Sequence, residues 1–106
     1  MIRVEVAPRR CRLTVTGHAC SGAFGQDLVC AGVSAVAVTL AEAVTALEQA
    51  GKVTAVTARL VPGQAEIACR PRLGQRRVTE AVFAAAALGL RRLEREYPDY
   101  VNLETL

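Results

Sequence analysis

One histidine and one cysteine stand out as the residues of this chain best suited to chemistry near neutral pH. His18 is the only histidine, and its side chain has an ordinary pKa close to neutrality. Cys30 follows it by a short stretch of chain, and a thiol becomes a strong nucleophile when a neighbouring base removes its proton. The two residues together predict nucleophilic catalysis, with Cys30 as nucleophile and His18 as base. The plainer alternatives are an exposed loop histidine and a small buried cysteine.

The position of Cys30 favours the catalytic interpretation. Asp27 is a good N-cap and Gly51 a good residue to follow a helix, so the pattern predicts a helix from Asp27 to about Ala50. Cys30 would then lie in the first turn. The unpaired N–H groups and the helix dipole there would stabilise a thiolate, and could donate to the oxyanion of a tetrahedral intermediate.

Two further polar residues are candidates for supporting roles. Asp27 could orient His18, although it could equally serve only as the helix cap. Ser34 comes one helical turn after Cys30 and could hydrogen-bond near the thiol or to an incoming peptide. The alternative for Ser34 is a hydrogen bond to the backbone of its own helix.

The segment between the candidate base and the predicted helix contains three glycines and no hydrophobic period. Residues 17–26 therefore predict a flexible loop, long enough to bring His18 over the start of the helix. We expect this loop to meet the substrate through Gly17, Gly22, Phe24 and Gly25, with apolar pockets near Phe24 and the helix start.

The remaining chain predicts two hairpins and a second helix. Residues 2–6 and 11–16 alternate between apolar and polar and predict the first hairpin. Residues 53–61 and 64–70 flank a Pro62-Gly63 turn of type II character and predict the second. A helix is expected over 75–97, and the tail 99–106 should add a short strand or dock on the sheet. Cys11 and Cys69 fall on the apolar faces of their strands and are interpreted as core residues.

These elements predict a single α+β domain over residues 1–106. The order is ββα-ββα, with a mostly antiparallel sheet and both helices packed on it. Apolar residues make up 52% of the chain and aromatic residues only 4%, so the core should be aliphatic. The first half of the helix that follows Asp27 is apolar nearly all round and should be buried on several sides. The apolar surplus of the two helices favours a homodimer.

The net charge and the hydrophobic segments of the chain indicate which partners and which cellular compartment to expect. The net charge of +3 is too small to require a polyanion. Residues 28–41 are apolar but fall short of the roughly 20 residues that a membrane span needs. The chain enters its first strand pattern directly and shows no signal-peptide pattern, so we expect a cytoplasmic protein without a membrane association. Its four cysteines should then be reduced, and no CxxC pair indicates a zinc or redox motif.

The block around the candidate pair resembles a known family. Gly17-His18-Ala19, followed by Gly25-x-Asp27-Leu28-Val29-Cys30-Ala31-Gly32-Val33-Ser34-Ala35, is similar to the motif of the ribosomal-processing cysteine protease family, called Prp. The resemblance implies a homodimeric enzyme that removes a short N-terminal extension from the twenty-seventh protein of the large ribosomal subunit. It implies that His18 and Cys30 are the catalytic pair and that Asp27 and Ser34 support them. It also implies a loop that moves when substrate arrives, which Gly22 and Gly25 would permit.

Two residues depart from the family pattern. Gly32 stands where the family usually has alanine, which weakens the helix by roughly 1 kcal/mol. Cys20 is an additional thiol in the loop. One hypothesis is that Cys20 pairs oxidatively with Cys30 and switches the enzyme off; the alternative is a harmless substitution.

Two other functions compete with proteolysis. A metal site could use His18, Cys20 and Cys30, but no fourth ligand is evident and the spacing fits no standard zinc pattern. A non-catalytic ribosome- or RNA-associated module could use the basic residues near two turns, namely Arg9, Arg10 and Arg12 with Arg70, Arg72, Arg76 and Arg77. Such clusters are usually solvated charge, and no aromatic-rich motif accompanies them. We therefore expect no metal, no cofactor and no direct role for nucleic acid.

Overall fold

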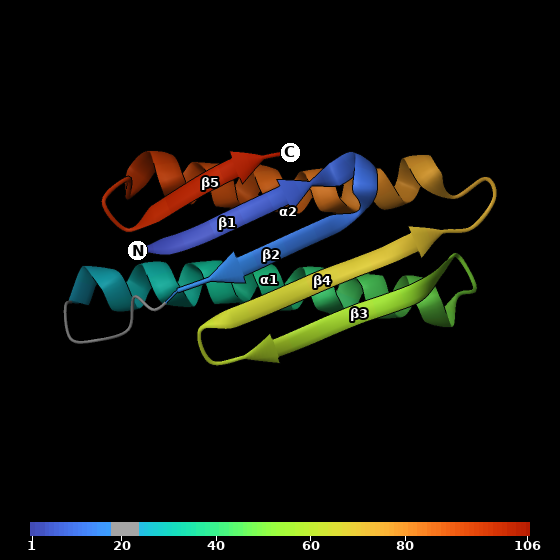
Figure 1. The fold of residues 1–106 in the computed structure, drawn as a ribbon, viewed down its shortest axis with the longest axis horizontal. Helices are drawn as coiled ribbons and strands as arrows, with labels where there is room; N and C mark the ends of the chain where they lie inside the picture. The colour runs from blue at the N-terminus through green and yellow to red at the C-terminus, as the bar shows by residue number, and fades with distance from the viewer. Residues whose placement is uncertain (18–23) are drawn as a thin grey trace.

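The chain folds into two layers, a five-stranded sheet and two long helices that cover one of its faces (Figure 1). The computed structural model describes residues 1–17 and 24–106, and for residues 24–27 it describes the backbone alone. The elements in chain order are β1 (Ile2–Ala7), the short 3-10 helix η1 (Pro8–Arg10), β2 (Arg12–Thr16), α1 (Phe24–Gln49), β3 (Val53–Val61), β4 (Gln64–Pro71), α2 (Arg76–Glu96) and β5 (Val101–Thr105). The predicted α+β fold is confirmed.

The sheet has the strand order β3-β4-β2-β1-β5. Neighbouring strands are antiparallel except for β1 and β5, which are parallel, with Val4 opposite Leu103. The tail of the chain thus adds an edge strand beside the first strand, which is the first of the two arrangements predicted for it. A hydrogen bond from the backbone N–H of Ile2 to the carbonyl of Tyr100, at 2.8 Å, joins the two strands where they begin.

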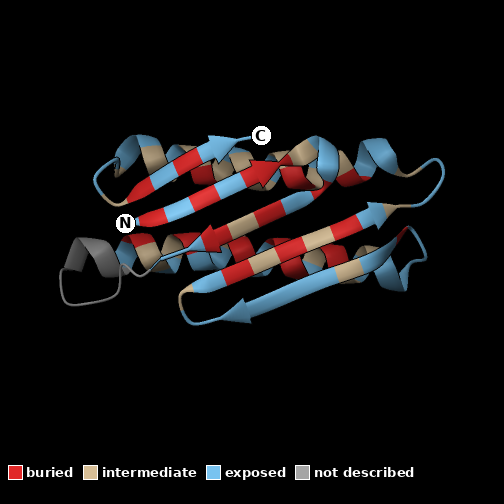
Figure 2. Ribbon diagram, viewed as in Figure 1, coloured by how far each residue is buried: buried red, intermediate tan, exposed pale blue. Residues whose placement is uncertain are grey.

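Alternation along the strands separates the core from the open face of the sheet, as the banding in Figure 2 shows. The helix-facing residues are almost all buried aliphatic side chains: Ile2, Val4, Val6, Leu13, Val15, Ala65, Ile67, Val101 and Leu103. Val33, Leu40 and Val44 of α1 and Phe83 and Leu90 of α2 pack against them. Cys11 and Cys69 belong to the same core, which confirms their interpretation as packing residues.

The first long helix differs from the prediction at its start and in its burial. It begins at Phe24, three residues before the predicted N-cap Asp27, so the predicted boundary was wrong. Expected burial on several sides is wrong as well, since Leu28 is 52% exposed and Val38 is 45% exposed. The segment from Leu28 to Gln49 is long and apolar enough to cross a membrane by length and composition, a test that core helices of globular proteins also pass.

The turn between β3 and β4 brings the hairpin tip toward α1. Gly63 has a φ of +77°, the conformation that the predicted Pro-Gly turn of type II requires at its second central residue. Residue pairs Leu60–Ala65 and Val61–Gln64 close the ladder immediately beside this turn. The hairpin therefore carries two exposed apolar side chains, Leu60 and Val61, to the edge of the helix layer.

Candidate active site

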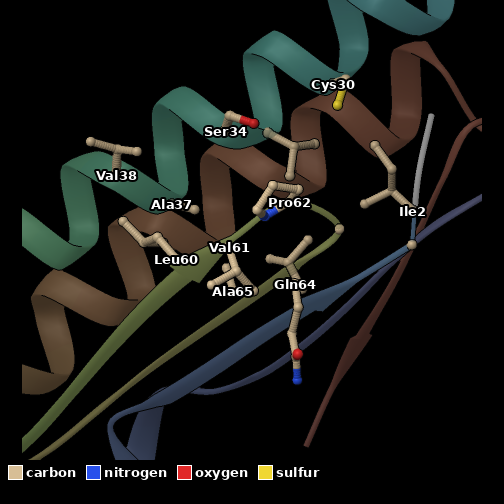
Figure 3. Close-up of a pocket in the computed structure, with 14 residues that line it drawn as sticks. Ile2, Cys30, Ser34, Ala37, Val38, Leu60, Val61, Pro62, Gln64 and Ala65 are labelled. Atoms are coloured by element: carbon tan, nitrogen blue, oxygen red, sulfur yellow. The ribbon is translucent and has the colours of Figure 1, made fainter. Parts of the chain in front are cut away.

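A pocket of about 270 Å³ lies between α1 and the tip of the β3–β4 hairpin. Cys30, Ser34 and Val38 line it from the helix, and Leu60 through Ala65 line it from the hairpin (Figure 3). Ile2, Val15 and Gly17 line it from the first two strands. The pocket is thus formed by segments far apart in the sequence, and its wall is mostly apolar.

Cys30 and Ser34 lie one turn apart on the side of α1 that faces the hairpin, as Figure 3 shows. Residues four apart share a helix face, and Val38 continues the same row one turn further. Cys30 is partly buried and packs against the hydrophobic core, whereas Ser34 is exposed. The structure therefore brings the predicted nucleophile and the predicted supporting serine into one pocket.

Cys30 is disulfide-bonded in this structure, so the prediction that all four cysteines are reduced was wrong for Cys30. A sulfur in a disulfide is not a nucleophile, because the thiolate is the reactive form. The described fold therefore represents an oxidised state of the pocket cysteine. Any reaction that uses this sulfur must begin with its reduction.

The helix start does not position Cys30 in the way that the sequence suggested. Since α1 begins at Phe24, Cys30 is in the second turn, where a backbone N–H group bonds to the carbonyl four residues earlier. The prediction that Cys30 lies in the first turn beside unpaired N–H groups was therefore wrong. The dipole effect is also confined largely to the first turn, so it contributes less to a thiolate here than expected.

Gly17 connects the second strand to the pocket and occupies a conformation that only glycine adopts without strain. Its φ is +107°, and a Cβ atom built on it would collide with the carbonyl oxygen of Met1. Its N–H group donates to the carbonyl of Gly63 at 3.0 Å, which joins the end of β2 to the hairpin turn. This residue, predicted for the substrate loop, therefore lies in the pocket wall.

The other candidate residues fall outside the described residues or change element. His18 follows Gly17 in the chain and, like Cys20 and Gly22, lies outside the described residues. Phe24, Gly25 and Asp27 were expected before the helix or at its cap; the structure places their backbones within α1, which corrects that expectation. Their side chains are not described.

The sequence interpretation missed the hairpin side of the pocket. Leu60 and Val61 are 43% and 41% exposed, and both line the pocket together with Pro62. Ile2, which also lines the pocket, was predicted only as part of the first strand. The signal that could have identified the hairpin is the pair of bulky apolar residues directly before a Pro-Gly turn, where polar residues are usual.

The two cysteines away from the pocket have a different environment. Burial raises the pKa of the Cys69 thiol to about 11, and the neighbouring Cys11 adds to this rise. Burial also raises the pKa of Cys11, with Glu80 acting in the same direction. Both thiols are therefore protonated near neutral pH and poor nucleophiles. Within residues 1–17 and 24–106, no cluster of three His, Cys, Asp or Glu side chains is arranged to hold a metal ion.

Comparison with solved structures finds proteins of the same fold. The essential ribosomal processing protease Prp from S. aureus, solved in complex with a substrate peptide, superposes with a TM-score of 0.71 at 23% identity, and each chain covers 100% of the other. The same protease with a covalently linked product peptide gives a TM-score of 0.72 at 23% identity, again with full coverage of both chains. SMU.848 from Streptococcus mutans gives 0.73 at 26% identity, covering 100% of this chain and 94% of its own. A comparison with curated proteins finds no match.

A comparison with family models assigns the chain to a protein family. The model of the cysteine protease Prp matches residues 1–102, nearly the whole chain, including the Gly17–Ala35 block whose motif suggested the family. The match also includes all of the residues that line the pocket. The chain belongs to the cysteine protease Prp family and is a cysteine protease.

Proposed function

We propose that this cysteine protease removes an N-terminal extension from a ribosomal protein of the large subunit, the twenty-seventh, with Cys30 as nucleophile and His18 as base. The observation that carries the proposal is the shared pocket: Cys30, Ser34 and Gly17 line one apolar hollow, and Gly17 is the residue to which His18 is bonded. The S. aureus relative supports it, because that protein is a ribosomal processing protease that was solved with a substrate peptide.

The proposed reaction is acyl transfer through the sulfur of Cys30. The reduced thiol gives its proton to His18, and the thiolate attacks the scissile carbonyl carbon. The tetrahedral intermediate collapses when His18 returns the proton to the leaving amine, which leaves an acyl-enzyme. A water molecule, deprotonated by His18, then hydrolyses the thioester and regenerates the thiol.

Ser34 is the described residue best placed to hydrogen-bond to the substrate. Its hydroxyl is exposed, lies one turn from Cys30 and lines the same pocket. A hydroxyl can donate to a carbonyl oxygen or to an oxyanion, a task that the first-turn N–H groups were expected to perform. We assign Ser34 the role of a donor to the substrate backbone near the scissile bond.

The shape of the pocket favours an extended peptide with an apolar side chain. Val38 on the helix and Leu60 and Val61 on the hairpin expose aliphatic surface on two sides of the pocket. An apolar side chain seated there would remove this surface from water, at about 25 cal/mol per Å². We propose that this apolar part of the pocket selects the cleaved segment, along α1 beyond Cys30.

The decisive experiment incubates the full-length ribosomal protein of the same organism, extension included, with the reduced enzyme and identifies the products by mass. Wild type should release the extension as one fragment. Cys30→Ala should lower the cleavage rate by at least about 10³-fold without unfolding the domain, since the nucleophile is lost. Cys69→Ala is the matched control: it removes a buried thiol outside the pocket and should retain cleavage.

Two outcomes would overturn the proposal. Full activity of Cys30→Ala would remove Cys30 from the mechanism. Cleavage of unrelated peptides by wild type, with the ribosomal protein left intact, would retain the enzyme class and exclude the substrate.

Two further expectations join this proposal. We propose that the active form is a homodimer, which the exposed apolar residues of α1 and α2, among them Leu28 and Leu88, support. Light scattering during size exclusion should give twice the mass of the chain, and a monomer at micromolar concentration would contradict it. We also propose a cytoplasmic location, in keeping with a ribosomal substrate, which cell fractionation would test.

A further inference from the structure

The fold gathers eight cationic side chains at the end of the molecule away from the pocket. In Figure 1, η1, the α1–β3 turn and the β4–α2 loop lie at one end of the sheet, whereas the end of β2 and the start of α1 lie at the other. All eight side chains are exposed, and we call this set the basic end: Arg9, Arg10, Arg12, Lys52, Arg70, Arg72, Arg76 and Arg77. Two clusters that are some 60 residues apart in the sequence thus form one surface.

Specific contacts hold these segments together. The guanidinium of Arg76 donates to the carbonyl oxygen of Arg9 at 3.2 Å, which connects the start of α2 to η1. The backbone N–H of Arg72 donates to the carbonyl of Lys52 at 3.0 Å, which connects the β4–α2 loop to the α1–β3 turn. The backbone N–H of Cys69 donates to the carbonyl of Cys11 at 3.1 Å, so that their neighbours Arg70, Arg10 and Arg12 are carried on adjacent segments.

The basic end is strongly positive even after its carboxylates are included. Glu66 pairs with Arg12 at 3.1 Å and Glu80 lies 3.9 Å from Arg76, while Glu48 lies near the end of α1. Glu5 lines a hollow together with Arg12, so the eight cations and four carboxylates give a net side-chain charge of +4, compared with +3 for the whole chain. The remainder of the chain is therefore net negative, so the charge is polarised along the molecule. Within the described residues, Arg10, Arg72 and Arg77 take part in no salt bridge.

We infer that the basic end is an RNA-binding surface that holds the phosphate backbone of a duplex. Seven of the eight cations are arginines, whose planar guanidinium matches phosphate oxygens in two parallel hydrogen bonds. The surface contains no aromatic residue on which unpaired bases could stack, so contact is with backbone rather than with single-stranded bases. Leu73 and Val78 are its only large exposed apolar side chains among the described residues, too little for the apolar centre of an acidic protein's interface.

The choice of RNA rather than DNA rests on the proposed function, because a ribosomal protein is a substrate found with RNA. The basic end and the pocket lie at opposite ends of the sheet, so one molecule can hold RNA while it cleaves a peptide. Binding by the basic end would raise the local concentration of substrates that are attached to the same RNA.

The test measures binding of a fluorescein-labelled RNA duplex of about 20 base pairs by anisotropy, from 50 to 200 mM salt. The logarithm of the binding constant should fall linearly with the logarithm of salt concentration, with a slope between about −3 and −6. A triple variant, Arg10→Gln, Arg72→Gln and Arg77→Gln, should reduce the slope by about 3 and weaken binding at least tenfold at 100 mM salt. These three side chains make no described salt bridge, so the fold should remain intact.

A matched control removes the same total charge from elsewhere on the surface. Arg3→Gln, Arg59→Gln and Arg95→Gln replace three exposed arginines outside the basic end and should change the slope by less than about 1. Equal losses in the two triple variants would show that only net charge matters and would overturn the inference. Displacement of the RNA by polyglutamate at equal charge would also overturn it, in favour of an acidic protein partner.

The failure of this inference can be told apart from failure of the proposed function. Cleavage of a short peptide from the ribosomal substrate, without RNA, should be the same in wild type and in the basic-end variant. A variant that retains RNA binding in full refutes the surface alone. An enzyme that binds RNA and cleaves no ribosomal protein refutes the proposed substrate alone.

Discussion

Replacing Gly17 by alanine tests whether the pocket depends on a single backbone conformation. Gly17 has a φ of +107°, and an added Cβ would meet the carbonyl oxygen of Met1. The obstacle is main chain, held in place beside β1, so it cannot rotate away as a flexible side chain would. Gly51 provides a matched control because its φ of +73° is also positive but a Cβ there meets nothing within 4 Å.

The structure allows the two substitutions to be ranked. Gly51→Ala incurs only the cost of a left-handed conformation, about 1 kcal/mol. Gly17→Ala costs about 1–2 kcal/mol for its φ, which is less favourable for alanine than that of Gly51. The collision of the added methyl group with the Met1 carbonyl costs about 1–3 kcal/mol more. The free energy of unfolding should therefore fall by about 2 kcal/mol more for Gly17→Ala than for Gly51→Ala, which is roughly a 30-fold difference in the folding equilibrium.

Urea denaturation of the reduced proteins, followed by circular dichroism, measures this difference directly. Peptide cleavage, assayed where each variant is fully folded, should also fall for Gly17→Ala and stay unchanged for Gly51→Ala, because only Gly17 lines the pocket. Equal losses of stability in the two variants would refute the argument from the Met1 carbonyl. A stable Gly17→Ala with wild-type cleavage would show that the pocket does not depend on this conformation.

Two further predictions concern the edge strand and the buried thiols. Glu94→Ala should lower the free energy of unfolding by about 1–3 kcal/mol in urea denaturation, because the Leu103 N–H of β5 donates to the Glu94 carboxylate at 2.6 Å. The control Glu96→Ala, at an exposed residue, should lower it by less than about 0.5 kcal/mol. Similar losses in the two variants would contradict this role of Glu94. Stability should fall above pH 9, because the unfolded chain loses the Cys69 proton near 9 while the folded chain retains it until about pH 11. The full fall is about 3 kcal/mol, of which about 2 kcal/mol has occurred by pH 10.5. Denaturation of wild type at pH 8 and pH 10.5 measures it, and an equally steep fall in Cys69→Ala would refute the assignment.

Much of the fold was accessible from the sequence because local patterns agreed with the global arrangement. Alternation in residues 2–6 and the Pro62-Gly63 turn each predicted an element that the structure contains. The parallel pairing of β5 with β1 was less accessible, because nothing local in residues 101–105 specifies a partner some 100 residues earlier. The start of α1 at Phe24 was missed for a different reason: Asp27 looks like an N-cap, but the helix continues through it.

The candidate site was predictable on one side only. Cys30 and Ser34 share a helix face by spacing alone, and the structure places both in the pocket. The opposite wall, formed by Leu60 and Val61, depends on how the hairpin folds over α1, which is a long-range property. Whether the catalytic pair is as the motif implies stays a prediction, since His18 lies outside the described residues.

The proximity of Met1 to Gly17 has a practical consequence for handling the protein. Ile2 lines the pocket, and Met1 lies against Gly17 in the pocket wall. A peptide fused ahead of Met1 would therefore begin beside the pocket and could enter it in place of a substrate. The backbone N–H of Leu106 instead donates to the carbonyl of Val6 at 2.8 Å, at the other end of β1. An affinity handle for kinetic work therefore belongs after Leu106, about the length of a strand from the sulfur of Cys30.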